Sequence, residues 1–124
     1  MSGAAPRLKG ESGNTRRFQR YALDMRVAVN VFREGKVLDF WGRSTELGED
    51  GLGATLTGEL EPGEVVSMEF PLPLSAYPLK VRAIVRFRQG LHYGFEFLTI
   101  NKDQHEMLQR VCEMLASSGS SSQP

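Results

Sequence analysis

Three arginines within five residues, Arg16, Arg17 and Arg20, form the group in this chain best suited to bind an anion. Guanidinium groups hold phosphate oxygens through paired hydrogen bonds and also stack on planar rings. An alternating apolar segment starts at Tyr21, so the cluster lies at the entrance to a predicted strand. A turn at this point would let all three arginines surround one ligand. The alternative explanation is a solvated run of charge at the start of a strand.

A second segment suited to binding spans residues 46–53. Gly48, Gly51 and Gly53 leave backbone N–H groups open to close approach by a phosphate or a base. Glu46 offers a carboxylate that accepts two N–H donors, and the Watson–Crick edge of guanine presents such a pair. The alternative here is a hairpin whose glycines adopt positive φ.

Groups suited to catalysis are scarce. Cys112 is the only cysteine, and its place on the apolar face of a predicted helix is typical of inert packing. His92 and His105 are the only histidines, and neither has a nucleophile or metal ligand at an informative spacing. We therefore expect no catalytic residue, no metal site, no cofactor and no enzyme activity.

Composition and charge place the chain among ordinary globular proteins. Its 124 residues fit one domain, and 40% are hydrophobic and 24% charged. No segment has the apolar length of a membrane span or a signal peptide, which predicts a cytoplasmic protein. Residues 1–20 carry a net charge of +4 and residues 21–124 a net charge of −4. An acidic body disfavours DNA as a partner, whereas a small anion fits between the two parts; the basic arm could also rest on the acidic body without a ligand.

The order of elements predicts a mainly β fold. Residues 1–15 read as a flexible arm, residues 16–115 as the folded domain and residues 116–124 as a disordered tail. Period-two alternation and turn residues predict six short antiparallel strands, which favour a small barrel or sandwich. Their ranges are 21–32, 37–47, 52–56, 65–70, 79–87 and 91–98. A helix follows, with Asn101 and Gln104 as a capping box, and it covers an end or a face of the strands.

Three motifs in this order resemble the PilZ domain family. Residues 16–20 match RxxxR, residues 46–51 align with [D/N]xSxxG, and residues 93–97 are similar to the closing YGVxF strand of that family. The resemblance covers about residues 16–115. It implies a six-stranded antiparallel β-barrel with a C-terminal α-helix, and cyclic di-GMP as the ligand. The ligand-binding residues that follow are Arg16, Arg17, Arg20, Glu46, Gly48 and Gly51, with Arg86 as a candidate for stacking on a base.

Two residues depart from the family pattern. Glu46 replaces Asp or Asn, and Gly48 replaces Ser. The glutamate keeps the carboxylate one methylene further out, but the serine hydroxyl is lost. A hydrogen bond to a charged group contributes about 1.5–3 kcal/mol, so its loss weakens binding roughly tenfold to a hundredfold.

The resemblance leads to two functional hypotheses. The first is a non-enzymatic receptor in motility or biofilm regulation, whose arginine arm becomes ordered on cyclic di-GMP and signals to an effector protein. The alternative is a degenerate PilZ domain that binds a protein partner without nucleotide in motility or pilus systems. Trp41 is expected in the core or on a half-covered face, or else as an exposed anchor for a partner. The apolar loop 71–78 is either a lid on the barrel or a docking patch.

Overall fold

The computed structural model describes residues 18–118 and shows seven strands followed by one helix. The strands are β2 (Tyr21–Ala22), β3 (Arg26–Arg33), β4 (Lys36–Leu47), β5 (Gly51–Leu56), β6 (Val65–Phe70), β7 (Leu79–Gln89) and β8 (His92–Thr99), and the helix is α1 (Lys102–Ser117).

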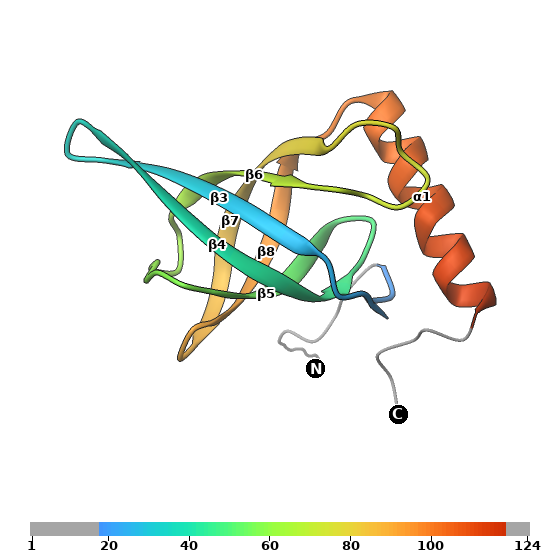
Figure 1. The fold of residues 1–124 in the computed structure, drawn as a ribbon, viewed down its shortest axis with the longest axis horizontal. Helices are drawn as coiled ribbons and strands as arrows, with labels where there is room; N and C mark the ends of the chain where they lie inside the picture. The colour runs from blue at the N-terminus through green and yellow to red at the C-terminus, as the bar shows by residue number, and fades with distance from the viewer. Residues whose placement is uncertain (1–17, 119–124) are drawn as a thin grey trace, which may run out of the picture.

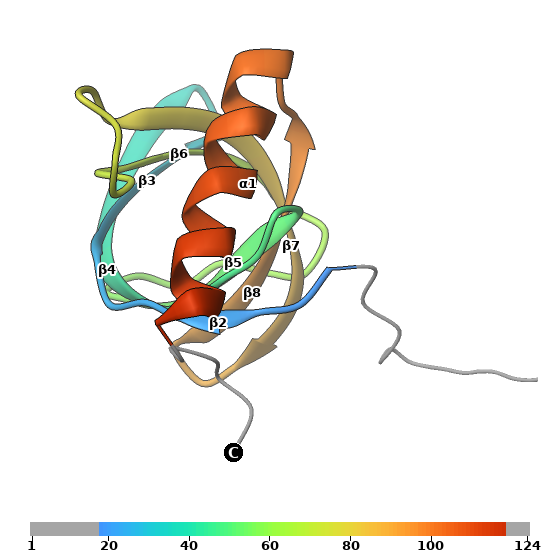
Figure 2. The same ribbon diagram turned by 90° about the vertical axis from the view of Figure 1, so that its right-hand side faces the viewer.

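The strands form a closed six-stranded antiparallel β-barrel, as predicted, and their order around it is β4-β3-β6-β7-β8-β5. Pairing of β4 with β5 closes the barrel, and the short β2 adds to β4 as an extra strand. The helix α1 lies across one open end of the barrel (Figures 1 and 2). No helix in the described part of the chain is long and apolar enough to cross a membrane.

The barrel encloses one hydrophobic core. Alternate residues of β3, namely Val27, Val29 and Val31, point inward and are buried. Tyr93 and Phe95 on β8 fill the interior with large aromatic side chains. Four buried residues of α1 close the helical end: Leu108, Val111, Cys112 and Leu115.

The predicted strand over residues 21–32 is wrong in one respect, because the chain leaves strand geometry between β2 and β3. The cause is Ser44, a buried polar residue on β4. Its hydroxyl accepts from the Met25 N–H at 2.9 Å and donates to the Leu23 carbonyl. A side chain thus replaces part of the backbone pairing, and β4 shifts register between Ser44 and Glu46.

The helix begins as predicted and ends later. Asn101 and Gln104 form the capping box, with each side chain accepting from the other residue's backbone N–H. The helix continues through Ser117, so Ala116 and Ser117 belong to it and not to a disordered tail. The predicted arm 1–15 and residues 119–124 lie outside the described residues.

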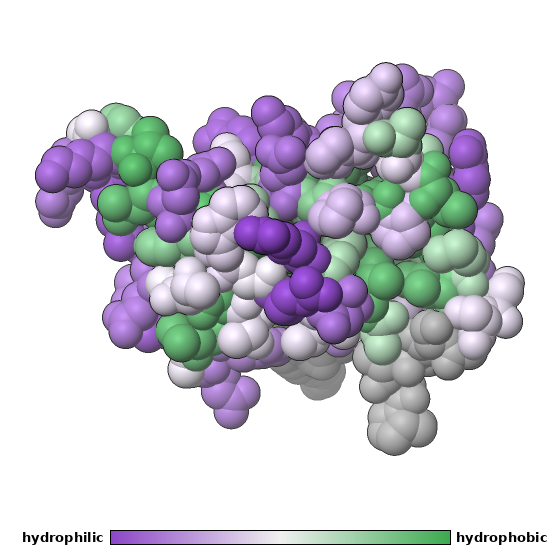
Figure 3. All heavy atoms as spheres, viewed as in Figure 1, coloured by the Kyte–Doolittle hydropathy of each residue, from purple (hydrophilic) through white to green (hydrophobic). Residues whose placement is uncertain are grey.

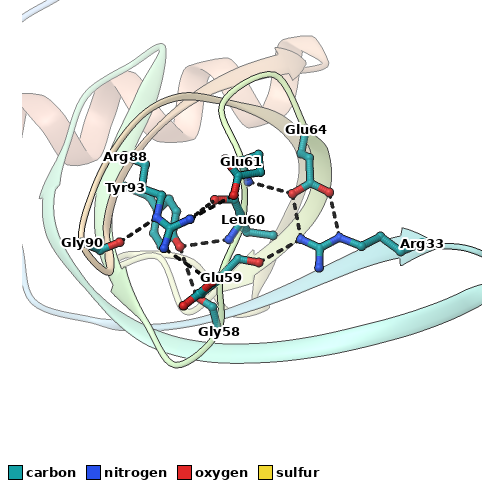
Figure 4. Close-up of polar contacts among 9 residues, drawn as sticks. All are labelled: Arg33, Gly58, Glu59, Leu60, Glu61, Glu64, Arg88, Gly90 and Tyr93. Atoms are coloured by element: carbon teal, nitrogen blue, oxygen red, sulfur yellow. Dashed lines mark hydrogen bonds and ion pairs between the residues drawn. The ribbon is translucent and has the colours of Figure 1, made fainter.

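A loop over residues 57–64 closes the barrel end away from α1 (Figure 4). Its Leu60 is fully buried, and the Tyr93 hydroxyl accepts from the Leu60 N–H at 2.9 Å and donates to the Gly58 carbonyl at 3.2 Å. Arg33 at the end of β3 donates twice to Glu64, at 2.9 and 2.8 Å, and this contact lowers the pKa of the Glu64 carboxyl. The loop is therefore held by hydrogen bonds from two sides of the barrel.

We expect Tyr93→Phe to lower the free energy of unfolding by about 1–3 kcal/mol, because it leaves a buried N–H and a carbonyl without their shared partner. Urea unfolding followed by fluorescence measures the change. Tyr77→Phe is the matched control, since Tyr77 is 79% exposed. Equal stabilities of the two variants would contradict the role given to the Tyr93 hydroxyl.

Candidate ligand-binding site

Arg20 lies against the turn between β4 and β5. Its Nη1 is 3.6 Å from Glu46 Oε2, and its Nη2 is 3.5 Å from Asp50 Oδ1. Only 10% of the Arg20 side chain is exposed. The structure thus brings the last arginine of the first motif onto the second motif, although more than 20 residues separate them along the chain.

The glycines of the turn are explained by close approach and not by backbone conformation. A Cβ added at Gly48 would lie 2.7 Å from Arg20 Cδ and 2.8 Å from Arg20 Nε. A Cβ at Gly51 would overlap the Phe95 carbonyl oxygen. Within residues 18–118, positive φ occurs at other glycines and at neither of these. The alternative of a hairpin that needs positive φ is therefore wrong for Gly48 and Gly51.

One backbone N–H group of the turn is engaged in a hydrogen bond within the turn. The Gly48 N–H donates to the Gly51 carbonyl at 2.8 Å. This N–H is consequently engaged within the turn, and what Gly48 offers a ligand is space beside Arg20.

The outer wall next to the turn carries a strip of glycines. Gly51 and Gly53 alternate with buried leucine and alanine on β5, and Gly53 pairs in register with Gly94 of β8. Side chains from the neighbouring strands cover these glycines: Glu46 borders Gly53, and the Phe87 ring covers Gly94 so closely that a Cβ there would overlap it. Arg20 and Glu46 therefore border the strip on one side, and Phe87 borders it on the other.

Phe87 is a candidate ligand residue that the motifs did not indicate. It is 42% exposed, so one face of its ring is open for stacking on a base. His92 lies beside it with ring centroids 6.0 Å apart, and His92 Nε2 is 3.2 Å from Thr45 Oγ1. The sequence carried a signal for this residue, because a tight hairpin turn at Gly90 sets Phe87 opposite Gly94.

Of the other three predicted arginines, the structure describes only Arg86. Arg86 on β7 donates from Nε to the Glu96 carboxylate, and Glu96 stands opposite Gly51 in the sheet. Arg86 therefore lies at the border of the glycine strip but is paired with a carboxylate. Arg16 and Arg17 lie outside the described residues.

The turn also contacts the helix. Glu49 Oε1 is 3.5 Å from His105 Nε2 in the first turn of α1. Burial raises the pKa of the Cys112 thiol to about 12, with further contributions from the charges of Glu49 and Asp50. Cys112 therefore stays protonated at neutral pH.

Residues 18–118 contain no group of three His, Cys, Asp or Glu side chains that could hold a metal ion.

The comparison with family models identifies the class of protein. The model of the PilZ domain matches residues 14–114. The chain therefore belongs to the PilZ domain family. A search of curated proteins finds no match.

Solved structures share this fold at low sequence identity. The PilZ domain of YcgR from Escherichia coli with c-di-GMP is 20% identical with a TM-score of 0.63, over 84% of this chain and 93% of that one. The PilZ domain of CeSA from a cellulose-synthesizing bacterium is 16% identical with a TM-score of 0.56, over 81% and 97%. The Bacillus subtilis inhibitor of motility MotI/DgrA is 18% identical with a TM-score of 0.66, over 83% and 51%. The present chain thus spans about half the length of the motility inhibitor.

We expect Cys112 to be unreactive in the folded protein. A pKa of about 12 against an ordinary value of 9.0 reduces the thiolate fraction about a thousandfold, and burial slows access further. The rate of reaction with a disulfide reagent at neutral pH, compared in native buffer and in denaturant, measures this. Fast modification of the native protein would contradict it.

Proposed function

We propose that this chain is a non-enzymatic, cytoplasmic receptor for cyclic di-GMP. The observation that carries the proposal is Arg20, held over the glycine turn between Glu46 and Asp50. Two further points support it: the chain is a PilZ domain, and the YcgR structures with the same fold are complexes with c-di-GMP.

Binding would proceed by an exchange of partners at Arg20. In the structure, the carboxylates of Glu46 and Asp50 neutralise its charge. A ligand phosphate takes the guanidinium, while the N–H donors of a guanine take the Glu46 carboxylate. Arg16 and Arg17 would add charge for the second phosphate, since cyclic di-GMP carries two.

The second base of cyclic di-GMP would lie at the other border of the glycine strip. The open face of Phe87 offers a stacking surface, and Arg86 would stack only after leaving Glu96. We therefore place a base on Phe87 before Arg86.

The signal to an effector would come from ordering of the arginine arm and from the helix. Arginines drawn onto the barrel by the ligand create a new surface beside the turn. The Glu49–His105 contact joins the same turn to α1. A change in the turn on binding would thus reach the helix directly.

A nucleotide-independent interaction module is the second candidate function. It is favoured by Gly48, which lacks the serine hydroxyl of the family motif, and by the two carboxylates that already form ion pairs with Arg20. MotI/DgrA, an inhibitor of motility with the same fold, suggests the kind of system in which such a module acts.

Arg20→Ala and Arg16→Ala should each weaken cyclic di-GMP binding at least about tenfold, because each removes a charge-assisted contact to phosphate. Titration calorimetry of the full chain measures this. Arg110→Ala is the matched control, since Arg110 is an exposed arginine of α1. Absence of heat with the wild-type protein, with partner binding unchanged in both variants, would decide for the interaction module.

Gly48→Ser should bind cyclic di-GMP roughly tenfold to a hundredfold more tightly than wild type, because it restores a hydroxyl donor and its Cβ displaces Arg20 from the turn. Gly48→Ala displaces Arg20 without adding a hydroxyl, so it separates the two effects. The same calorimetric titration reports both. Weaker binding by both variants would show that Arg20 must lie on the turn for the ligand to bind.

A further inference from the structure

The side of the barrel opposite the glycine strip carries an exposed tryptophan beside a groove. In the ring of six strands, β3 and β6 lie three places from β8 and β5, so they form the wall opposite the strip. Trp41 on the adjoining strand β4 is 48% exposed. Figure 3, in the same view as Figure 1, has β3 and β4 in front and shows strongly hydrophilic surface there beside paler, less polar surface. Polar and apolar groups therefore meet on this wall.

The groove beside Trp41 has a volume of about 220 Å³ and mostly apolar walls. Ala28 on β3 pairs with Trp41 on one side and with Glu69 of β6 on the other, and its small side chain leaves the floor of the groove open. Pro71 and Pro78, at the two ends of the loop between β6 and β7, also line the groove. Proline has no backbone N–H, so these walls present rigid apolar surface to an occupant.

The loop that supplies the two prolines is fixed to the barrel. Its Leu72 is buried, the Leu72 N–H donates to the Phe70 carbonyl at 3.0 Å, and the Leu72 carbonyl accepts from the Ser75 N–H at 3.2 Å. The Ser75 hydroxyl donates to the Tyr77 carbonyl at 2.7 Å. The groove is therefore already formed without an occupant.

Arg26 places an unused set of hydrogen-bond donors at the edge of the groove. Its guanidinium lies 4.4 Å from the centre of the Trp41 ring. Within residues 18–118, the Arg26 side chain makes no hydrogen bond or ion pair. Arg43, its cross-strand neighbour on β4, donates instead to Asp24 at 2.8 Å. Stacking on the indole orients the Arg26 guanidinium and leaves its N–H groups available to hold a carboxylate through paired hydrogen bonds.

The charges next to the groove favour a negative partner. Glu69 is the one acidic residue among the described residues that line the groove, and Lys80 of β7 stands opposite it. Glu69 and Lys80 also line an adjoining hollow of about 410 Å³, together with Arg82. The side chains of Lys80 and Arg82 have no hydrogen-bond or ion-pair partner in the described part of the chain. Since residues 21–124 carry a net charge of −4, this excess of positive charge is a local feature.

We propose that the Trp41 groove is the docking site for a segment of a partner protein in which an apolar side chain lies next to a carboxylate. The apolar side chain fills the groove over Ala28, and the carboxylate binds the Arg26 guanidinium. Half-exposed tryptophans beside a pocket are frequent energetic centres of interfaces. A short segment buries little area, so the complex is weak. Binding does not require cyclic di-GMP, because no residue of the groove belongs to the glycine strip or its borders.

The test uses short random peptides displayed on phage and selected on the full chain without nucleotide, after removal of those that bind the Trp41→Ala protein. We expect the selected sequences to combine Leu, Met or Phe with a neighbouring Asp or Glu. Synthetic copies without tryptophan should change the emission of Trp41, which is the only tryptophan in the chain. The anisotropy of labelled copies gives the affinity for each variant.

Arg26→Gln should weaken peptide binding at least about tenfold, because it removes the charge-assisted contact to the carboxylate. Arg26→Lys should fall between wild type and Arg26→Gln, since it keeps the charge without the paired donors. Ala28→Ile should also weaken binding at least about tenfold, because its side chain occupies the floor of the groove. Arg43→Gln is the matched control, because it makes the same change on the adjacent strand at an arginine already paired with Asp24.

Circular dichroism shows that every variant is folded. No enrichment of peptides over the Trp41→Ala protein overturns the proposal. So do selected peptides that are basic or uncharged, equal affinities of wild type and Arg26→Gln, or undiminished binding by folded Ala28→Ile. A dimer of the chain in sedimentation velocity that the peptide dissociates would also overturn it, because a second copy would then be the occupant of the groove.

Discussion

The contact on which the rest of the site depends is Arg20 lying between Glu46 and Asp50 on a turn without side chains. It joins the N-terminal segment to the β4–β5 turn, and Glu49 in the same turn reaches α1 through His105. A guanidinium that is 10% exposed needs carboxylate partners, because an unpaired buried charge is strongly destabilising. A phosphate that binds Arg20 would therefore have to displace these two carboxylates.

The two departures from the family motif make physical sense in this arrangement. The longer Glu46 reaches from β4 across Gly53 to Arg20. Gly48 leaves the space in which the Arg20 side chain lies, where any Cβ would be too close. Glu46 and Gly48, the two residues that depart from the motif, thus both accommodate Arg20 on the turn.

Sequence patterns predicted the barrel because alternation, turn residues and the capping box are local signals. The succession of strands and the start of the helix followed from them. The family motifs implied that Arg20 and the Glu46–Gly51 turn serve one site, but not that Arg20 lies on the turn without a ligand. The break before β3 was not predictable, since it depends on a hydrogen bond from Ser44, about 20 residues away. The tight turn around Gly90 could have placed Phe87 opposite Gly94, but the pairing of Arg86 with Glu96 lies at a register shift between Val85 and Phe87 that a strand prediction does not give.

Amide chemical-shift changes during titration with cyclic di-GMP test the exchange of partners at Arg20 most directly. We expect the largest shifts in residues 46–53 and at Gly94, with a new environment for the Arg20 Nε–H and smaller shifts in the first turn of α1 around His105. Residues 28–41 of the opposite wall should stay unchanged. Unaltered spectra at saturating ligand, or shifts confined to other parts of the barrel, would contradict a ligand site centred on Arg20.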